Sequence, residues 1–326
     1  MRSLGAMFVL GAGSLGCLWA ARLARGAALP GGGPEARATR LLLRPGSPKA
    51  SSSAKSEIRV TGVGDIDSFV QRVQAEEVSA SNAPIERLLL VTKAQAAEAA
   101  MRQVAPRLQP GAVVVLLCNG ALALQEQIGV GGIHVVLGLT THGAWSKADF
   151  DVVHAGWGDT RFGKVGPIPE SLYQSTLQHL ETAGLGATDD SDIRRSLWLK
   201  LAANAVINPM TALSEKPNGF ILDSAAQSQV QKVCQEVADV AKAMQDEGGS
   251  CPSLQDMLGF VRKTASQTAD NMSSMLQDIR AGRSTEIDFI NGWVAAKALQ
   301  YGIEASENAR LVAMVKQKER MQSSHQ

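Results

Sequence analysis

Short apolar runs alternate with segments of helical period through the first half of the chain. We predict buried strands at residues 7–10, 39–44, 87–92, 112–117 and 134–140, and helices at 17–26, 94–108 and 121–129. All-apolar strands that alternate with helices are typical of a parallel sheet covered on both faces. The pattern therefore predicts an α/β fold with a doubly wound, Rossmann-type parallel sheet.

The second half has a different pattern. From Ile193 onward the period is helical, with predicted breaks at Pro209, residues 217–219, residues 248–252, Gly282 and Gly302. This indicates an all-α domain. We expect a boundary near Asp190, which gives domains at residues 1–190 and 191–326.

Three connecting segments carry their own signals. Residues 149–156 and 159–166 alternate with period two around Trp157-Gly158, which predicts a hairpin that closes the sheet. A helix is predicted at 169–183. Residues 26–38, rich in Gly, Pro and Ala, are predicted to form a long connection after the first helix.

A glycine pattern follows the first predicted strand immediately. Its glycines allow a tight turn, approach of the backbone to a pyrophosphate, and close packing of helix on strand. The predicted cofactor-binding turn is Gly11, Ala12, Gly13, Ser14, Leu15 and Gly16. The same apolar stretch also has features of a secretory signal, which is the weaker interpretation.

Polar residues stand at the ends of the later strands, where ligands of such sheets collect. Arg44, in place of an acidic residue, favours a 2′-phosphate and hence NADP, although a solvated arginine is the alternative. Lys49 is a candidate second phosphate contact. Lys93 and Asn119 are candidates for cofactor binding, against the alternatives of a solvated charge and a turn residue.

A row of polar residues interrupts the most apolar helical segment, residues 196–208. Lys200, Asn204 and Asn208 are spaced by four and share one face of the predicted helix. Such groups are costly to bury without partners, so we expect this row to meet a substrate and a cofactor.

A second polar cluster precedes residue 293. Glu286 begins a predicted helix with an apolar stripe, and the alternative is a first-turn glutamate that complements the helix dipole. Asn271, Ser274 and Asp278 are expected on adjacent turns of the preceding helix. Asp278 has the alternative role of pairing with Arg280 or Arg283.

Composition narrows the class of protein. The 326 residues, 45% apolar and 19% charged, suggest two globular domains. A net charge of +1 implies no bulk attraction to nucleic acid or to an anionic membrane. The four cysteines show no metal-ligand spacing, so we expect no metal site and a reducing, cytoplasmic location.

Several motifs together resemble the ketopantoate reductases over nearly the whole chain. The motifs are GAGSLG, LLLVTKA, CNG, GLTTHGA, LWLKLAANAVINPMTAL, NMSSMLQDIRAGRSTEIDFINGW and GIEASENARLVAMVKQKE. Members of this family use NADPH to reduce 2-dehydropantoate to pantoate, which implies a role in pantothenate biosynthesis.

The resemblance also implies roles for individual residues. Lys200 matches the general acid that protonates the carbonyl oxygen, and Glu286 matches the glutamate that assists it. The substrate-pocket positions of the family are matched by Asn204, Asn208, Asn271 and Ser274. Arg44 matches the residue that binds the cofactor phosphate. Lys93 and Asn119 match positions that lie against the cofactor and the active site. The sequence departs from the family at NGALAL, after Asn119, and in the longer insertion at 26–38.

The expected ligand is thus a small 2-keto acid bound in a cleft between two domains, with the chain a monomer or homodimer. Two alternatives stay open. One is an NADP-dependent reductase of another 2-keto acid, and the other is a non-catalytic NADP-binding sensor. Retention of Lys200 and Glu286 argues against a sensor, because a sensor requires no acid facing the nicotinamide.

Overall fold

The computed structural model describes residues 5–27, 38–47, 49, 55–128, 131–245 and 250–323. The chain divides into two compact units, Met1–Ile193 and Arg194–Gln326. Most of the predicted connection at 26–38 lies outside the described residues. No helix among the described residues is long and apolar enough to cross a membrane.

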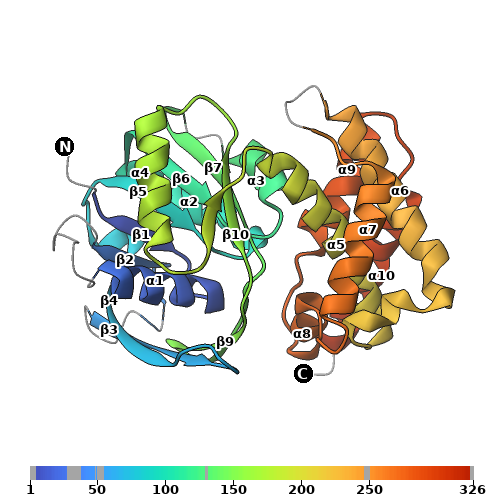
Figure 1. The fold of residues 1–326 in the computed structure, drawn as a ribbon, viewed down its shortest axis with the longest axis horizontal. Helices are drawn as coiled ribbons and strands as arrows, with labels where there is room; N and C mark the ends of the chain where they lie inside the picture. Colours follow the sequence, from blue (N-terminus) through green and yellow to red (C-terminus); the bar gives the residue numbers. More distant parts are fainter. Residues whose placement is uncertain are drawn as a thin grey trace. The chain divides into compact units, whose positions relative to one another are not determined.

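The first unit is built on one sheet, which contains 11 strands in its described part (Figure 1). Their order across the sheet is β11-β10-β7-β6-β5-β1-β2-β4-β3-β9-β8. The strands are β1 (Met7–Leu10), β2 (Thr39–Leu43), β3 (Lys55–Gly62), β4 (Phe69–Glu77), β5 (Ile85–Leu90), β6 (Leu108–Leu116), β7 (His134–Thr140), β8 (Gly143–Ala148), β9 (Asp151–Gly156), β10 (Thr160–Lys164) and β11 (Ala187–Asp189).

The centre of the sheet confirms the predicted fold class. The run β4-β2-β1-β5-β6-β7 is parallel throughout, with chain order reversing at β1. This is the strand order of dinucleotide-binding folds, in which ligands bind beyond the carboxyl ends of the strands near the reversal. Antiparallel pairs occur only toward the two edges, at β7–β10, β3–β4 and β8–β9.

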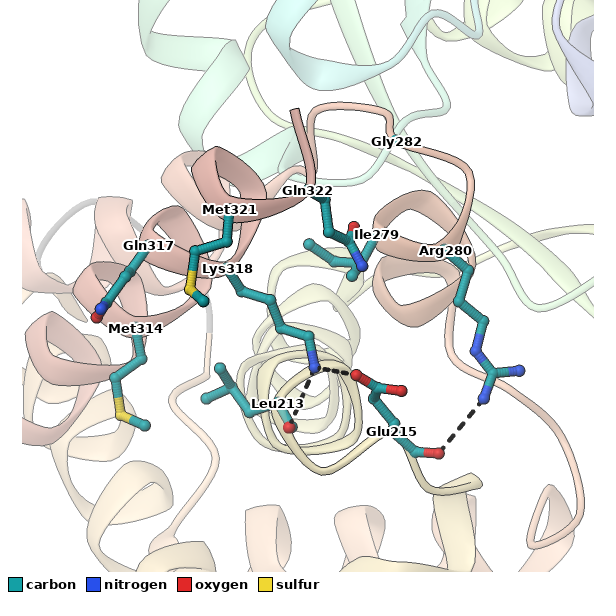
Figure 2. Close-up of a pocket in the computed structure, with 10 residues that line it drawn as sticks. All are labelled: Leu213, Glu215, Ile279, Arg280, Gly282, Met314, Gln317, Lys318, Met321 and Gln322. Carbon is teal, nitrogen blue, oxygen red and sulfur yellow. Dashed lines mark hydrogen bonds and ion pairs between the residues drawn. The ribbon is translucent and has the colours of Figure 1, made fainter. Parts of the chain in front are cut away.

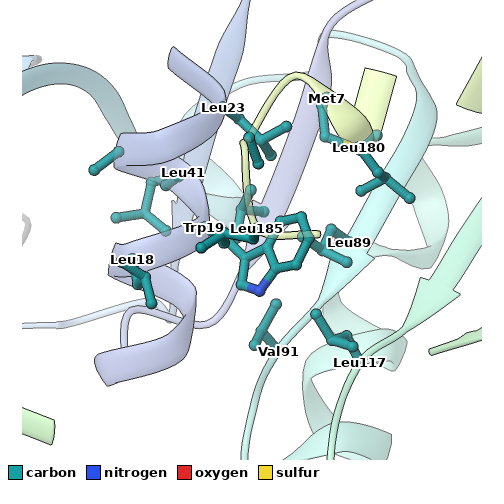
Figure 3. Packing of buried hydrophobic residues seen from close by; sticks show 14 of the residues in the cluster. Met7, Leu18, Trp19, Leu23, Leu41, Leu89, Val91, Leu117, Leu180 and Leu185 are labelled. Atoms are coloured by element: carbon teal, nitrogen blue, oxygen red, sulfur yellow. The ribbon is translucent and has the colours of Figure 1, made fainter. Parts of the chain in front are cut away.

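Helices cover both faces of this sheet. They are α1 (Ser14–Ala27), α2 (Ala94–Val104), α3 (Ala121–Gln127) and α4 (Glu170–Glu181). Because strand order reverses at β1, right-handed crossovers place α1 on one face and α2 and α3 on the other. Trp19 of α1 is fully buried among apolar side chains such as Leu89 and Leu180 (Figure 3). Its ring also meets Phe162 edge-on, with ring centroids 6.0 Å apart.

The predicted hairpin at residues 149–166 is wrong. Strand β9 pairs with β3 and β8, whereas β10 pairs with β7 and β11. The intervening residues do not form a two-residue turn, since the Gly158 backbone packs against Thr141 and His142. Thr140 and Thr160 then share a hydrogen bond of 3.1 Å, which aligns β10 with β7.

The second unit is helical in its described residues, as predicted. Its helices are α5 (Ile193–Ser214), α6 (Gln227–Ala243), α7 (Leu254–Gln267), α8 (Ser274–Arg280), α9 (Asn291–Gln300) and α10 (Ser306–Ser323), with 3-10 turns η4 (Asn218–Leu222), η5 (Ser224–Ala226) and η7 (Ile287–Phe289).

The predicted break at Pro209 is wrong, because α5 continues through it. Proline removes one helical hydrogen bond and usually ends or kinks a helix. Here residues on both sides, among them Val206 and Met210, are buried, so tertiary packing holds the helix across the missing donor.

Candidate active site

The glycine turn after β1 has the three properties expected of a dinucleotide-binding turn. Gly11 has φ of 119°, which favours glycine, and a Cβ on Gly16 would lie 1.7 Å from the Gly11 main-chain oxygen. A Cβ on Gly13, in contrast, would meet no atom within 4 Å in the described part of the chain. The turn is therefore tight at Gly11, closely packed against α1 at Gly16, and open at Gly13, where a phosphate would approach the N-terminus of the helix.

Four of the predicted cofactor positions follow four neighbouring parallel strands. Arg44 follows β2, the glycine turn follows β1, Lys93 precedes α2 after β5, and Asn119 lies between β6 and α3. Carboxyl ends of parallel strands share one edge of a sheet, so the fold brings these positions to the same edge. Arg44 and Lys93 are exposed and Asn119 is half-buried.

Lys49 reaches the glycine turn itself. Its Nζ donates to the main-chain oxygen of Ala12 at 2.9 Å and lies 3.1 Å from a carboxylate oxygen of Asp149. A cation thus stands beside the turn that the sequence predicted to bind a phosphate group.

The polar residues that follow β7 have structural partners. Thr141 Oγ1 accepts from Asp159 N at 2.9 Å. His142 Nδ1 and His154 Nε2 are 3.0 Å apart, and His142 Nε2 lies 3.0 Å from the Leu185 oxygen. Burial lowers the pKa of both imidazoles, and the pKa of His154 falls to about 4 because the nearby His142 ring and Arg22 guanidinium lower it further. These groups hold the sheet edge together as neutral side chains.

In the helical unit, α5 carries the predicted polar row and leaves two of its three members half-buried. From Leu197 to Ala212 every residue is buried except Leu199, Lys200 and Asn204, which are half-buried. Asn208, the third member of the row, is only 6% exposed. The helix therefore buries most of its apolar surface and leaves Lys200 and Asn204 partly exposed.

Two other candidate segments pack on α5. Thr211 Oγ1 donates to Ser273 Oγ at 2.7 Å, which holds the start of α8 and hence Ser274 against the end of α5. Trp198 of α5 and Trp293 of α9 have ring centroids 5.5 Å apart. Glu286 precedes η7, directly before α9, and is 8% exposed.

Two local predictions in these segments are wrong. No continuous helix starts near Glu286: the residue is the N-cap of η7, and α9 begins at Asn291 after an irregular Ile290. Asn271 is not helical either, because the Ser273 side chain accepts from Leu276 N and so starts α8 at Ser274. Asp278 pairs with Arg283 at 2.9 Å, the alternative role considered for it.

A pocket of about 660 Å³ lies elsewhere in the helical unit (Figure 2). The side chains around it come from the end of α5, from α8 and from α10, and its polar end is the ion pair of Lys318 with Glu215 at 2.7 Å. None of the predicted site residues lines it. The predicted site residues therefore lie outside this pocket.

Sequence reasoning missed Asn291, a fully buried residue that hydrogen-bonds α5. The available signal was Pro209, since a proline within a helix leaves the carbonyl four residues earlier without its helical donor.

Solved structures show the same fold over nearly the whole chain. A PanE/ApbA family ketopantoate reductase from Ralstonia eutropha JMP134 has a TM-score of 0.82 at 23% identity, covering 98% of this chain and 99% of that one. A ternary structure of D-mandelate dehydrogenase with NADH and anilino(oxo)acetate also has a TM-score of 0.82, at 20% identity and the same coverage. These structures share the architecture of this chain, a Rossmann-type sheet unit with a glycine turn after its first strand, followed by a helical unit.

Sequence comparisons define the family. Residues 7–167 match the family model described as ketopantoate reductase PanE/ApbA, and residues 192–319 match its C-terminal model. A 2-dehydropantoate 2-reductase from Shigella flexneri is 36% identical over 233 residues, which are 71% of this chain and 74% of that protein. The chain belongs to the ketopantoate reductase family, and the resemblance inferred from the motifs is confirmed.

Proposed function

We propose that this protein reduces 2-dehydropantoate to pantoate with NADPH, and that Lys200 is the general acid. The observation that carries the proposal is that Lys200 and Asn204 stay half-buried within residues 197–212 of α5, where every other residue except Leu199 is buried. The 36% identity to a 2-dehydropantoate 2-reductase supports the choice of substrate.

In this proposal the unit Met1–Ile193 binds the dinucleotide. The glycine turn holds the pyrophosphate at the start of α1, and it consists of Gly11, Ala12, Gly13, Ser14, Leu15 and Gly16. Lys93 and Asn119 stand at the ends of the nearby strands. Arg44, exposed at the end of β2, binds the 2′-phosphate, so NADPH is preferred to NADH. The fit rests on the open side of Gly13, where an added Cβ would meet no atom of the described residues within 4 Å.

The unit Arg194–Gln326 holds the substrate. When bound, NADPH would supply the hydride that reduces the keto carbon. Lys200 Nζ gives its proton to the keto oxygen, so that a hydroxyl forms, and the amine regains a proton from solvent. Glu286 assists Lys200 electrostatically. The keto acid is oriented through uncharged hydrogen bonds by Asn119, Asn204, Asn208, Asn271 and Ser274.

A second candidate is reduction of another 2-keto acid. The D-mandelate dehydrogenase structure has the same TM-score as the ketopantoate reductase, so fold alone does not separate the two substrates. The NGALAL segment after Asn119 also departs from the usual family sequence.

Steady-state kinetics with a panel of 2-keto acids tests the proposal. We expect kcat/KM to be highest for ketopantoate and NADPH. A higher value for a simpler 2-keto acid, such as phenylglyoxylate, would support the second candidate, and no oxidation of NADPH with any member of the panel would support the non-catalytic sensor.

A further inference from the structure

Pro209 creates an unusual acceptor inside α5. In an α-helix the N–H of each residue bonds the carbonyl four residues earlier, so Pro209 leaves the Ala205 oxygen without that donor. The proline ring also pushes this carbonyl away from the helix axis. A buried carbonyl without a partner is costly, and Ala205 is fully buried.

Asn291 supplies the missing donor. Its Nδ2 donates to the Ala205 oxygen at 2.9 Å, although 86 residues separate the two in sequence. The same Nδ2 donates to Asn308 Oδ1, also at 2.9 Å. Since Nδ2 faces two acceptors, the amide is held in one orientation, even though its own Oδ1 is buried without a partner.

A buried carboxylate fixes Asn308 in turn. Glu236 of α6, 9% exposed, accepts from Asn308 Nδ2 at 2.7 Å and from Asn308 N and Glu307 N at 2.8 Å each. These two backbone groups belong to the first turn of α10, where a negative charge is stabilised by the helix dipole. The relay therefore runs from α6 through α10 and α9 to the backbone of α5.

The end of this relay lies within the candidate catalytic row. Ala205 directly follows Asn204 and stands between Lys200 and Asn208 on α5. A hydrogen bond to its carbonyl fixes how far α5 can rotate or slide at this point. An error of about 1 Å in the position of a catalytic group is sufficient to reduce turnover up to about 100-fold.

We infer that Pro209 and Asn291 are a matched pair that positions the Lys200, Asn204 and Asn208 row. The proline exposes the carbonyl, and the asparagine, oriented by Asn308 and Glu236, captures it. Asn291 is thus a positioning residue for the reaction, and its catalytic part rests on the proposed function. Neither residue contacts the substrate in this scheme.

A double-mutant cycle tests the pairing. Asn291→Leu keeps the side-chain size but removes the donor. Pro209→Ala restores a backbone N–H that can bond the Ala205 oxygen. We expect Asn291→Leu to lower kcat about tenfold in the wild-type background and about twofold or less in the Pro209→Ala background, with NADPH Kd unchanged in both. Urea midpoints should show the same partial rescue.

Val261→Ala is the control. Val261 is fully buried in α7, so its truncation lowers the urea midpoint through a cavity without removing a donor to α5. We expect its kcat to remain within twofold of the wild type. If Val261→Ala loses as much kcat as Asn291→Leu, the effect of Asn291→Leu reflects general destabilisation and the positioning role is overturned.

Equal effects of Asn291→Leu in both backgrounds, on kcat and on the urea midpoint, would overturn the pairing. If Pro209→Ala rescues the urea midpoint of Asn291→Leu while kcat is the same in all variants of the cycle, the pairing is retained and the positioning role is overturned. A wild-type protein without keto-acid reductase activity would overturn the proposed function and the positioning role together, while the urea midpoints would still decide whether Pro209 and Asn291 are coupled.

Discussion

The ammonium group of Lys49 lies 2.9 Å from the main-chain oxygen of Ala12, in the middle of the glycine turn. Asp149 balances this cation at 3.1 Å, and its side chain is 64% exposed. Arg44 lies five residues before Lys49, at the end of the strand next to β1. Two cations therefore accompany the turn that we propose for the cofactor, and both are expected to favour a phosphorylated dinucleotide.

Removal of either cation should reduce the preference for NADPH. We expect Arg44→Ala and Lys49→Ala each to raise the Kd of NADPH about tenfold, since a charge-assisted hydrogen bond contributes about 1.5 to 3 kcal/mol before screening. The Kd of NADH should change less than threefold. Fluorescence titration of the reduced cofactors measures both, and Asp149→Asn should shift the NADPH value in the opposite direction. Equal losses for the two cofactors would argue against a 2′-phosphate contact.

Alanine at two of the turn glycines should have distinct effects. The Gly13→Ala methyl group meets no atom of the described residues within 4 Å, so we expect a folded protein with wild-type thermal stability. Its NADPH affinity should fall about tenfold or more, because the methyl group obstructs the pyrophosphate. Gly16→Ala would place Cβ 1.7 Å from the Gly11 oxygen and should lower stability as well. Thermal melts and cofactor titration of both variants separate these effects. Unchanged NADPH affinity in Gly13→Ala would place the phosphate elsewhere.

Lys200 should be required for turnover and not for cofactor binding. We expect Lys200→Ala to lower kcat for ketopantoate by about 100-fold or more, because general acid catalysis contributes about 10² to 10⁴. NADPH affinity should stay within several-fold. Lys216→Ala is the matched control, since Lys216 is an exposed lysine that follows α5 and contacts the Phe220 ring. Full turnover in Lys200→Ala would remove this residue from the chemistry.

The buried histidine pair should make stability fall in mild acid. His154 has its pKa lowered from 6.5 to about 4 by burial, so between these values the unfolded chain binds a proton that the folded protein does not. Its contribution is therefore intact above pH 6.5 and is lost as the pH falls toward 4. The expected loss is about 1 to 3 kcal/mol.

Urea unfolding from pH 7.5 to 4.5 measures this effect as a difference between proteins. His154→Phe should show a shallower decline than the wild type, because it removes the imidazole whose pKa is lowered. His142 should stay in place in this variant, since Gly158 N donates to its Nδ1 at 3.2 Å. His134→Gln, a change at a histidine outside the pair, should follow the wild-type curve. Parallel curves for His154→Phe and the wild type would show that the pair does not titrate in this range.

Much of the fold could be predicted from the sequence, because its central strands are continuous apolar runs. β1 and β7 have the predicted bounds, and β2, β5 and β6 differ by a few residues. β3 and β4 were not predicted. In β4 the polar residues Arg72, Gln74 and Glu76 alternate with Val73 and Ala75, which are the two buried residues of its nine. Such a pattern lacks the run that marks a buried strand.

The candidate site was predictable where it depends on local spacing. The four-residue spacing of Lys200, Asn204 and Asn208 needs only a helix to share a face, and the glycine turn needs only a strand before it. Contacts between distant segments were not predictable. The break expected at Pro209 fails because Asn291, 82 positions later in the sequence, bonds the carbonyl that the proline leaves free. The hairpin expected at 149–166 fails because β3 and β7 provide other partners.

The most direct test of the account is the absorbance of NADPH at the nicotinamide band after ketopantoate is added to the purified protein. We predict stoichiometric oxidation of NADPH with formation of pantoate, and loss of this reaction in Lys200→Ala with cofactor binding retained. Absence of NADPH oxidation by a folded, NADPH-binding wild-type protein would contradict it.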